Sequence, residues 1–257
     1  MNTSASLADA NVSAHHCDSK EINLYGTPNG LRHIANVVQT VADSDPQNDK
    51  GQEACTVISD DSGRIEFTGT DLEIRRMGYA KEELRLFLNG VEQFANRFLR
   101  QRRDFISRHL SELYERKVGS FTPHQLAGLD EEEQWFAPTN PNAYDIGDAI
   151  AVAYPVVDES PRLVIAGTSS GLQWIAKSLI CMADVEYGEY NPNWPENSEH
   201  HHSWLDGDND VMLECGFGLV YGRCDHRKDG SVDWYHECLS NSKERFRQFV
   251  AYVRNVA

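Results

Sequence analysis

The sequence predicts an α+β protein made of two tandem pseudo-repeats, each about β-α-β-β-β-α with an antiparallel sheet covered by helices. Residues 22–43 and 163–184 share eight identities over 22 positions at a constant offset of 141. Unrelated sequences would share roughly one or two. Each of these segments is followed by a β-branched, aromatic stretch and then by an amphipathic helical stretch. Together the two observations indicate a duplicated unit.

Each repeat opens with a short apolar strand, a sharp turn and a helix. The strand ends at Gly26 or Gly167. Thr27 or Thr168 follows, where a hydroxyl can accept hydrogen bonds from the free amides of the first helical turn. Pro28 suits the first helical position, which needs no amide hydrogen. Apolar residues then recur at helical spacing: Leu31, Ile34, Val38 and Val41 in the first copy, and Leu172, Ile175, Leu179 and Met182 in the second. A capped helix start explains this turn without a bound phosphate.

The next elements of each repeat are predicted to be β-hairpins. At an offset of 147, Leu72 matches Leu219 and Arg76 matches Arg223. In the second copy, residues 211–224 and 231–239 flank Lys228-Asp229-Gly230, a favourable hairpin turn. We expect the equivalent strands of the first copy at Leu72–Met77 and Glu83–Leu88.

A helix is predicted to close each repeat. In the second copy it spans Lys243–Val256. In the first it begins after Asn89-Gly90, where Asn89, Glu92 and Phe94 match Asn241, Glu244 and Phe246, and runs to Leu113. We therefore divide the chain into a disordered tail (1–20), a first α/β repeat with a long C-terminal helix (21–117), a helical or linker segment (118–160) and a second α/β repeat (161–257). Within the linker, residues 146–157 are apolar enough for a buried helix or strand, and periodicity leaves the two open.

Composition narrows the classes of partner. The 257 residues carry a net charge of −16, which disfavours nucleic acid because its phosphates would be repelled. No apolar run approaches the ~18–20 residues of a membrane span, and the polar N-terminus does not resemble a secretory signal. We therefore expect a cytoplasmic protein with its six cysteines reduced.

Histidines and cysteines gather in the second repeat. They are His200, His201, His202, Cys215, Cys224, His226, His236 and Cys238. Pairs separated by one residue lie on one face of a strand, so facing strands could bring four zinc ligands together. The cluster lacks Cys-x-x-Cys and His-x-x-x-His spacing, which favours a structural role instead.

Three further features have both a functional and a structural interpretation. Asp206, Asp208 and Asp210, with Glu214 nearby, resemble a calcium loop but fit a hairpin turn better. Trp194 and Trp204 flank a loop that either binds a partner or anchors to the core. The stretch from Arg97 to Lys117 has seven basic and three acidic residues, so the long helix either packs near acidic surfaces of its own fold or docks a partner.

The turns Gly26-Thr27-Pro28-Asn29-Gly30-Leu31 and Gly167-Thr168-Ser169-Ser170-Gly171-Leu172 resemble those of bacterial polymorphic-toxin immunity proteins. In that family a strand, a Gly-Thr-Pro-x-Gly-Leu turn and an amphipathic helix precede a His-containing segment, here compared with His200-His201-His202, and a β-hairpin. The resemblance covers about 55–75 residues in each half. It implies tight binding to a cognate toxin without catalysis.

Three functions are therefore expected, in order. The first is a non-catalytic cytosolic protein-binding protein, such as an immunity-type inhibitor of a basic toxin, whose charge would suit a protein of net −16. The second is a metal-dependent enzyme that uses the His/Cys cluster. The third is a structural scaffold or homodimer. No residue is assigned as catalytic, cofactor-binding or metal-binding, and no cofactor is expected.

Overall fold

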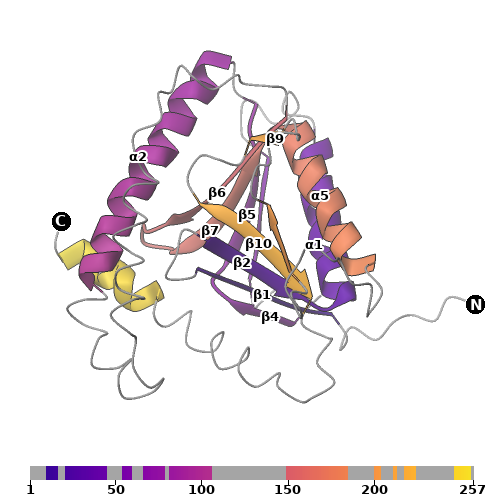
Figure 1. The fold of residues 1–257 in the computed structure, drawn as a ribbon, viewed down its shortest axis with the longest axis horizontal. Helices are drawn as coiled ribbons and strands as arrows, with labels where there is room; N and C mark the ends of the chain where they lie inside the picture. Colours follow the sequence, from indigo (N-terminus) through magenta and orange to yellow (C-terminus); the bar gives the residue numbers. More distant parts are fainter. Residues whose placement is uncertain are drawn as a thin grey trace, which may run out of the picture.

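The computed structural model describes residues 10–16, 21–44, 54–59, 66–78, 81–105, 149–184, 200–203, 211–212, 217–223 and 246–255. These residues form a mixed α+β fold with two five-stranded sheets (Figure 1). Sheet A has the order β4-β1-β2-β10-β8, and sheet B has the order β3-β5-β7-β6-β9. Both sheets contain parallel and antiparallel pairs, so the expectation of purely antiparallel sheets is wrong.

Each sheet combines strands from both halves of the sequence. Sheet A consists of β4 (Glu66–Gly69), β1 (Asn11–His16), β2 (Glu21–Gly26), β10 (Gly218–Arg223) and β8 (His200–Ser203). Sheet B consists of β3 (Cys55–Ile58), β5 (Leu72–Arg76), β7 (Arg162–Gly167), β6 (Ala149–Val156) and β9 (Val211–Met212). The two predicted repeats therefore do not build separate sheets.

Two parallel pairs join the halves, and they have matching registers. In sheet B, β5 runs parallel to β7 with Leu72 opposite Leu163 and Arg76 opposite Gly167. In sheet A, β10 runs parallel to β2, with Leu219 opposite Ile22 and Arg223 opposite Gly26. Leu72 and Leu219 are related by the repeat offset of 147, and Ile22 and Leu163 by the offset of 141. The two parallel pairs therefore place the same two positions of the repeat opposite one another.

Strand β1 overturns the predicted disorder for residues 11–16 alone, since residues 1–9 and 17–20 of the predicted tail lie outside the described residues. It pairs antiparallel with β2 and parallel with β4. Val12 and Ala14 are buried in the core, because alternate residues of a strand point to the same face. The apolar alternation covers only Ala10, Val12 and Ala14, which are small, so polar neighbours obscured it in the sequence.

Both Gly-Thr turns start helices as predicted. Helix α1 (Pro28–Asp43) has Thr27 as its N-cap, and the Gly30 amide donates to Thr27 Oγ1 at 3.3 Å. Helix α5 (Ser169–Asp184) begins in the same way, with the Gly171 amide donating to Thr168 Oγ1 at 3.2 Å. These bonds satisfy amides that the helix itself leaves without acceptors.

Helices α1 and α5 lie side by side and run antiparallel on one flank of the strands (Figure 1). Near the start of α1, Arg32 donates to Asp184 at the end of α5, with 2.6 Å between Nη2 and Oδ1. At the other end, Gln173 Nε2 donates to Asp43 Oδ1 at 3.1 Å. The offset of 141 relates Arg32 to Gln173 and Asp43 to Asp184, so the two contacts occupy corresponding positions.

Sheet B is covered on both faces. Its inner face contributes Leu72, Ile74, Ala151, Ala153, Leu163 and Ile165 to the main core. Its outer face contributes Ile150, Val152, Val164 and Ala166 to a second cluster with Leu84, Leu88 and Val91 of helix α2. Two-sided burial explains the nearly continuous apolar sequences of β6 and β7. It also settles residues 149–156 of the stretch 146–157, which was left open between helix and strand, as strand β6. Residues 146–148 lie outside the described residues.

Helix α2 (Lys81–Phe105) overturns the predicted strand at Glu83–Leu88. It also includes Asn89-Gly90, where we expected a helix to begin. Leu84, Leu88 and Val91 lie at helical spacing and share one buried face. That periodicity outweighs the turn preference of the Asn-Gly pair. The rest of the predicted long helix, from residue 106 to Leu113, lies outside the described residues.

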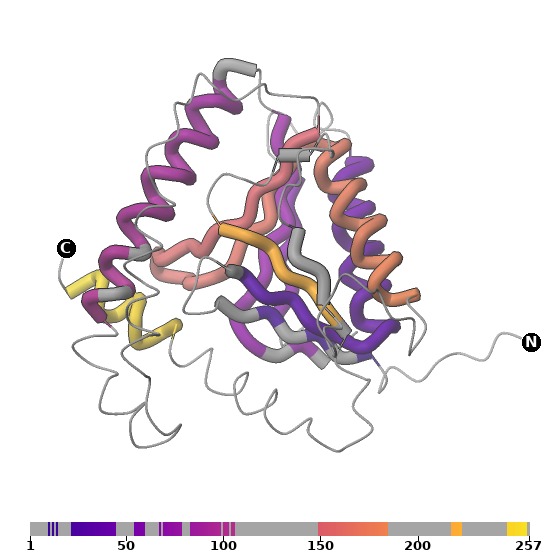
Figure 2. The backbone as a smooth tube through the Cα atoms, in the orientation of Figure 1, coloured from indigo at the N-terminus to yellow at the C-terminus, as the bar shows by residue number. Residues whose placement is uncertain are grey.

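An aromatic cluster joins α2 to the helix at 246–255, which falls within the predicted closing helix. The Phe98 ring centroid lies 4.8 Å from that of Phe249 and 5.3 Å from that of Phe217. Phe105 contacts Phe249 and Tyr252. Figure 2 shows the C-terminal helix beside the end of α2. These edge-on and tilted ring contacts fix the second half of α2 against the helix at 246–255.

We predict that Gly171→Ala lowers the free energy of unfolding by about 3 kcal/mol, because an added methyl overpacks this site. Its Cβ would lie 2.1 Å from the Ile150 carbonyl oxygen, and the backbone of β6 cannot yield easily. The matched control is Gly90→Ala, whose Cβ would meet nothing within 4 Å. It should raise stability by up to about 1 kcal/mol. Urea unfolding measures the free energy of unfolding of both variants. Similar values for the two would contradict the close approach of Gly171 to the backbone of Ile150.

Candidate interaction surface

The Gly-Thr turn of the second half is fully engaged within the protein. Thr168 donates its amide to the Ile150 carbonyl at 2.8 Å, and the Ile150 amide donates to Thr168 Oγ1 at 3.0 Å. Gly167 and Gly171 both lie against the backbone of Ile150, with no space for a Cβ. The turn therefore joins α5 to β6. This agrees with its interpretation as helix-start geometry.

The His/Cys cluster considered as an alternative zinc site is described only in part. His200–His202 lie on β8, an edge strand of sheet A, opposite Gly222, Tyr221 and Val220. The remaining members lie outside the described residues: Cys215, Cys224, His226, His236 and Cys238. Within the described ranges, no three His, Cys, Asp or Glu residues lie close enough to hold a metal ion.

Two other sequence candidates also lie outside the described residues. These are the aspartates of the possible calcium loop, Asp206, Asp208 and Asp210 with Glu214, and the loop tryptophans Trp194 and Trp204. The basic helix is described as far as Phe105 and divides between core and surface. Arg102 is buried with its guanidinium carbon 5.5 Å from the Phe249 ring centroid, whereas Arg97 and Arg100 are exposed.

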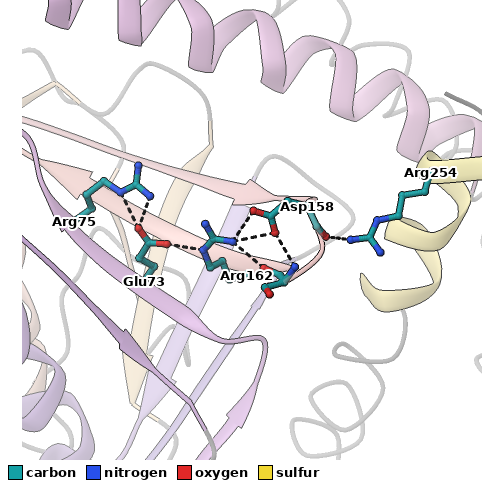
Figure 3. Close-up of polar contacts among 6 residues, drawn as sticks. Glu73, Arg75, Asp158, Arg162 and Arg254 are labelled. Carbon is teal, nitrogen blue, oxygen red and sulfur yellow. Dashed lines mark hydrogen bonds and ion pairs between the residues drawn. The ribbon is translucent and has the colours of Figure 1, made fainter. Parts of the chain in front are cut away.

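A chain of ion pairs crosses the outer face of sheet B (Figure 3). Glu73 on β5 is buried and accepts from Arg75 Nε at 2.7 Å and from Arg162 Nε at 2.5 Å. Arg162, on β7, also reaches Asp158 in the turn between β6 and β7, with 2.9 Å between Nη1 and Oδ2. The Asp158 carbonyl accepts from Arg254 of the C-terminal helix. These contacts connect the two halves of the sequence and the chain end.

The electrostatics of Glu73 favour its ionised form. Burial raises the pKa of this carboxyl, but hydrogen bonds from Arg162 and Arg75 outweigh burial and hold the pKa below its usual value. The carboxylate therefore stabilises the fold at neutral pH. Both oxygens of the Glu73 carboxylate accept from arginines. We therefore interpret this series of ion pairs as a structural link between β5 and β7.

Strand β3 is an exposed edge strand of sheet B. Cys55, Thr56 and Val57 are exposed in succession, and Val57 retains 51% of its accessible surface. Only Ile58 enters the core. Proteins usually protect edge strands with charged residues or proline, and Cys-Thr-Val-Ile contains neither. The sequence signal was a short β-branched run, which our strand assignment overlooked.

A second exposed feature follows the outer face of α2. Leu86 retains 72% of its accessible surface, although the neighbouring Leu84 and Leu88 are buried. Gly90, Gln93 and Arg97 are also exposed and continue the same face. We missed this face in the sequence because we began the helix after Asn89-Gly90.

The described helices include none with the length and apolar character needed to cross a membrane. Comparison of the chain with protein-family models, curated proteins and solved structures found no match.

We predict that Arg162→Met lowers the free energy of unfolding by about 2 kcal/mol at pH 7, because it leaves the buried Glu73 with fewer donors. The lowered pKa of Glu73 means that its stabilisation is present above the unfolded-state pKa of about 4.3 and is lost as pH falls through the folded-state pKa. The difference between the variant and the parent should therefore shrink below about pH 4.

Arg32→Met is the matched control for this measurement. It removes an interhelical ion pair whose two side chains are both well exposed, so its effect should stay within about 0.5 kcal/mol. Urea unfolding from pH 3 to pH 7 compares the two variants over roughly the range where carboxylates titrate. Equal losses at pH 7, or an Arg162→Met loss that persists unchanged in acid, would contradict the structural role of the ion-pair chain.

Proposed function

We propose that this protein is a non-catalytic cytoplasmic binding protein of the toxin-immunity type, built on a duplicated unit, which engages a basic protein partner. The observation that carries the proposal is the exposed, uncharged edge of β3, with Val57 at its centre. An open strand edge offers backbone hydrogen bonds to an added strand, and its side chains provide specificity.

Matching strand positions support the duplication. Each sheet has three neighbouring strands from one half (β4-β1-β2 or β9-β6-β7) and two from the other half (β10-β8 or β5-β3). The parallel pairs that join the halves have corresponding registers, with Leu72 opposite Leu163 and Leu219 opposite Ile22. We therefore interpret the chain as two units that exchange a pair of strands.

The roles of the repeated turn support a binding function over catalysis. Thr27 and Thr168 cap helices. Gly167 and Gly171 permit close packing against β6. Because the repeated residues serve the architecture, the residues that recognise a partner are expected on surfaces that differ between the halves. Strand β3 is such a surface, since Cys55–Val57 correspond in register to His200–His202 of β8.

Charge supports the choice of a basic partner. The chain has 40 acidic and 24 basic side chains and a net charge of −16. A field of this sign accelerates encounter with a positively charged protein and opposes encounter with an acidic one. A basic toxin domain that presents an extended segment would match both the charge and the open strand edge.

We predict that Val57→Lys weakens binding of the basic toxin domain encoded nearest to this gene by at least about tenfold, a change of ~1.4 kcal/mol. The substitution removes an apolar contact and places a positive charge on the strand edge. Ile180→Lys is the matched control, because Ile180 on α5 is also exposed, at 40%, and the charge change is identical. Titration calorimetry measures affinity, and inhibition of the toxin's activity provides a second measurement.

Two outcomes would contradict this proposal. One is an equal effect of Val57→Lys and Ile180→Lys, which would place recognition elsewhere. The other is stoichiometric zinc in the purified protein that is lost with His200→Ala, which would favour the metal-dependent alternative. Atomic absorption on the same preparation measures the metal content.

A further inference from the structure

The outer face of helix α2 forms a continuous exposed stripe. Its members recur three and four residues apart, the spacing that keeps side chains on one face of a helix. They are Glu83, Leu86, Gly90, Gln93, Arg97, Arg100 and Asp104, and all are exposed. The same spacing defines the contact seam of paired helices. We refer to these seven residues as the α2 stripe.

Within the α2 stripe, Gly90 is the residue that most directly indicates a contact with another backbone. It lies inside a 25-residue helix, where glycine is less favourable than alanine. A Cβ at this position would meet nothing within 4 Å. The only described glycine with a positive φ is Gly69, so the backbone of Gly90 does not require glycine. Neither packing within the described structure nor conformation explains the residue, whereas a backbone approaching from outside would.

Leu86 indicates the same face independently. It lies one helical turn before Gly90 and is the most exposed large apolar residue of the described structure, at 72%. It belongs to neither core cluster. An exposed apolar side chain beside a residue without a side chain forms a projection next to a hollow, which another helix of the same kind can fill.

We propose that the α2 stripe is a self-association surface, on which α2 of a second copy docks antiparallel and crosses at Gly90. Glu83 and Arg97 lie seven residues before and after Gly90, about 10 Å along the helix axis in each direction. A two-fold axis through Gly90 therefore places Glu83 against Arg97 of the second copy, twice per dimer. Leu86 then lies beside Gln93 of the second copy.

Charge favours a second copy over a basic partner at this face. The stripe carries two acidic residues, Glu83 and Asp104, and two basic residues, Arg97 and Arg100. It is thus neutral and self-complementary, although the whole chain has a charge of −16. Glu83 is exposed, and a carboxylate has capacity for several hydrogen bonds, so an additional partner fits its chemistry. The α2 stripe is separate from strand β3, so self-association through it does not depend on the proposed function.

Sedimentation equilibrium of the full chain tests the proposal. One helix face buries a small interface, so we expect reversible dimerisation over roughly 10 µM to 1 mM protein. Glu83→Arg and Arg97→Glu each place like charges in contact and should weaken dimerisation by about tenfold. Mixing the two variants should restore it as a heterodimer, because both contacts then pair opposite charges. Lys177→Glu on α5 is the control with the same charge change as Arg97→Glu, and it should leave dimerisation unchanged.

A second variant tests the crossing point. Gly90→Leu should abolish dimerisation, because its side chain occupies the space where the two backbones approach. Circular dichroism and a urea transition confirm that the variant remains folded. A chain that stays monomeric at 1 mM, or variants that dimerise as the parent does, would overturn the proposal. Failure of the mixed variants to associate would overturn the antiparallel register, and an acidic protein that binds the stripe in place of a second copy would overturn the choice of occupant.

Discussion

The parallel pairing of β5 with β7, and of β10 with β2, is the constraint on which the rest of the fold depends. Both pairs join strands from different halves of the chain. Without them neither sheet would reach five strands, and an inner edge of each would lie open. The ion pair between Glu73 and Arg162 adds a charged link across one of these pairs. Neither sheet can lose the strands that come from the other half of the sequence without exposing core residues such as Ile74 and Leu219.

Helices α1 and α5 directly follow β2 and β7, one strand from each of the two pairs that join the halves. Both helices pack their buried residues into the core that the inner face of sheet B also lines. Their antiparallel contact brings each helix end beside the start of the other, as the Arg32–Asp184 and Gln173–Asp43 contacts show. The close approach of Gly171 to β6 then sets the depth of α5. The position of α5 is thus set both by the local cap at Thr168 and by the long-range packing of Gly171 against β6.

The sequence was sufficient for the elements whose stabilisation is local. The strand, threonine cap and helix of each Gly-Thr turn were predicted because strand alternation, capping and helical spacing lie within about 20 residues. The partner of β5 was not predictable, since strand choice depends on contacts about 90 residues away in the sequence. The Glu83–Leu88 error had a different cause. Asn89-Gly90 was interpreted as a boundary, although the apolar spacing of Leu84, Leu88 and Val91 continues through it.

The related positions of β3 and β8 indicate how one scaffold can present two chemistries. In register, Cys55, Thr56 and Val57 take the places of His200, His201 and His202 along the outer strand of each sheet. One edge is uncharged and contains the β-branched pair Thr56-Val57, and the other consists of three histidines. Leu72 and Leu219 match but lie opposite Ile58 and Ser203. The residues opposite the three edge positions differ between the halves: Arg75, Ile74 and Glu73 in β5, and Gly222, Tyr221 and Val220 in β10. The β3 and β8 edges therefore present different side chains at corresponding positions, and recognition is best sought where the two halves differ.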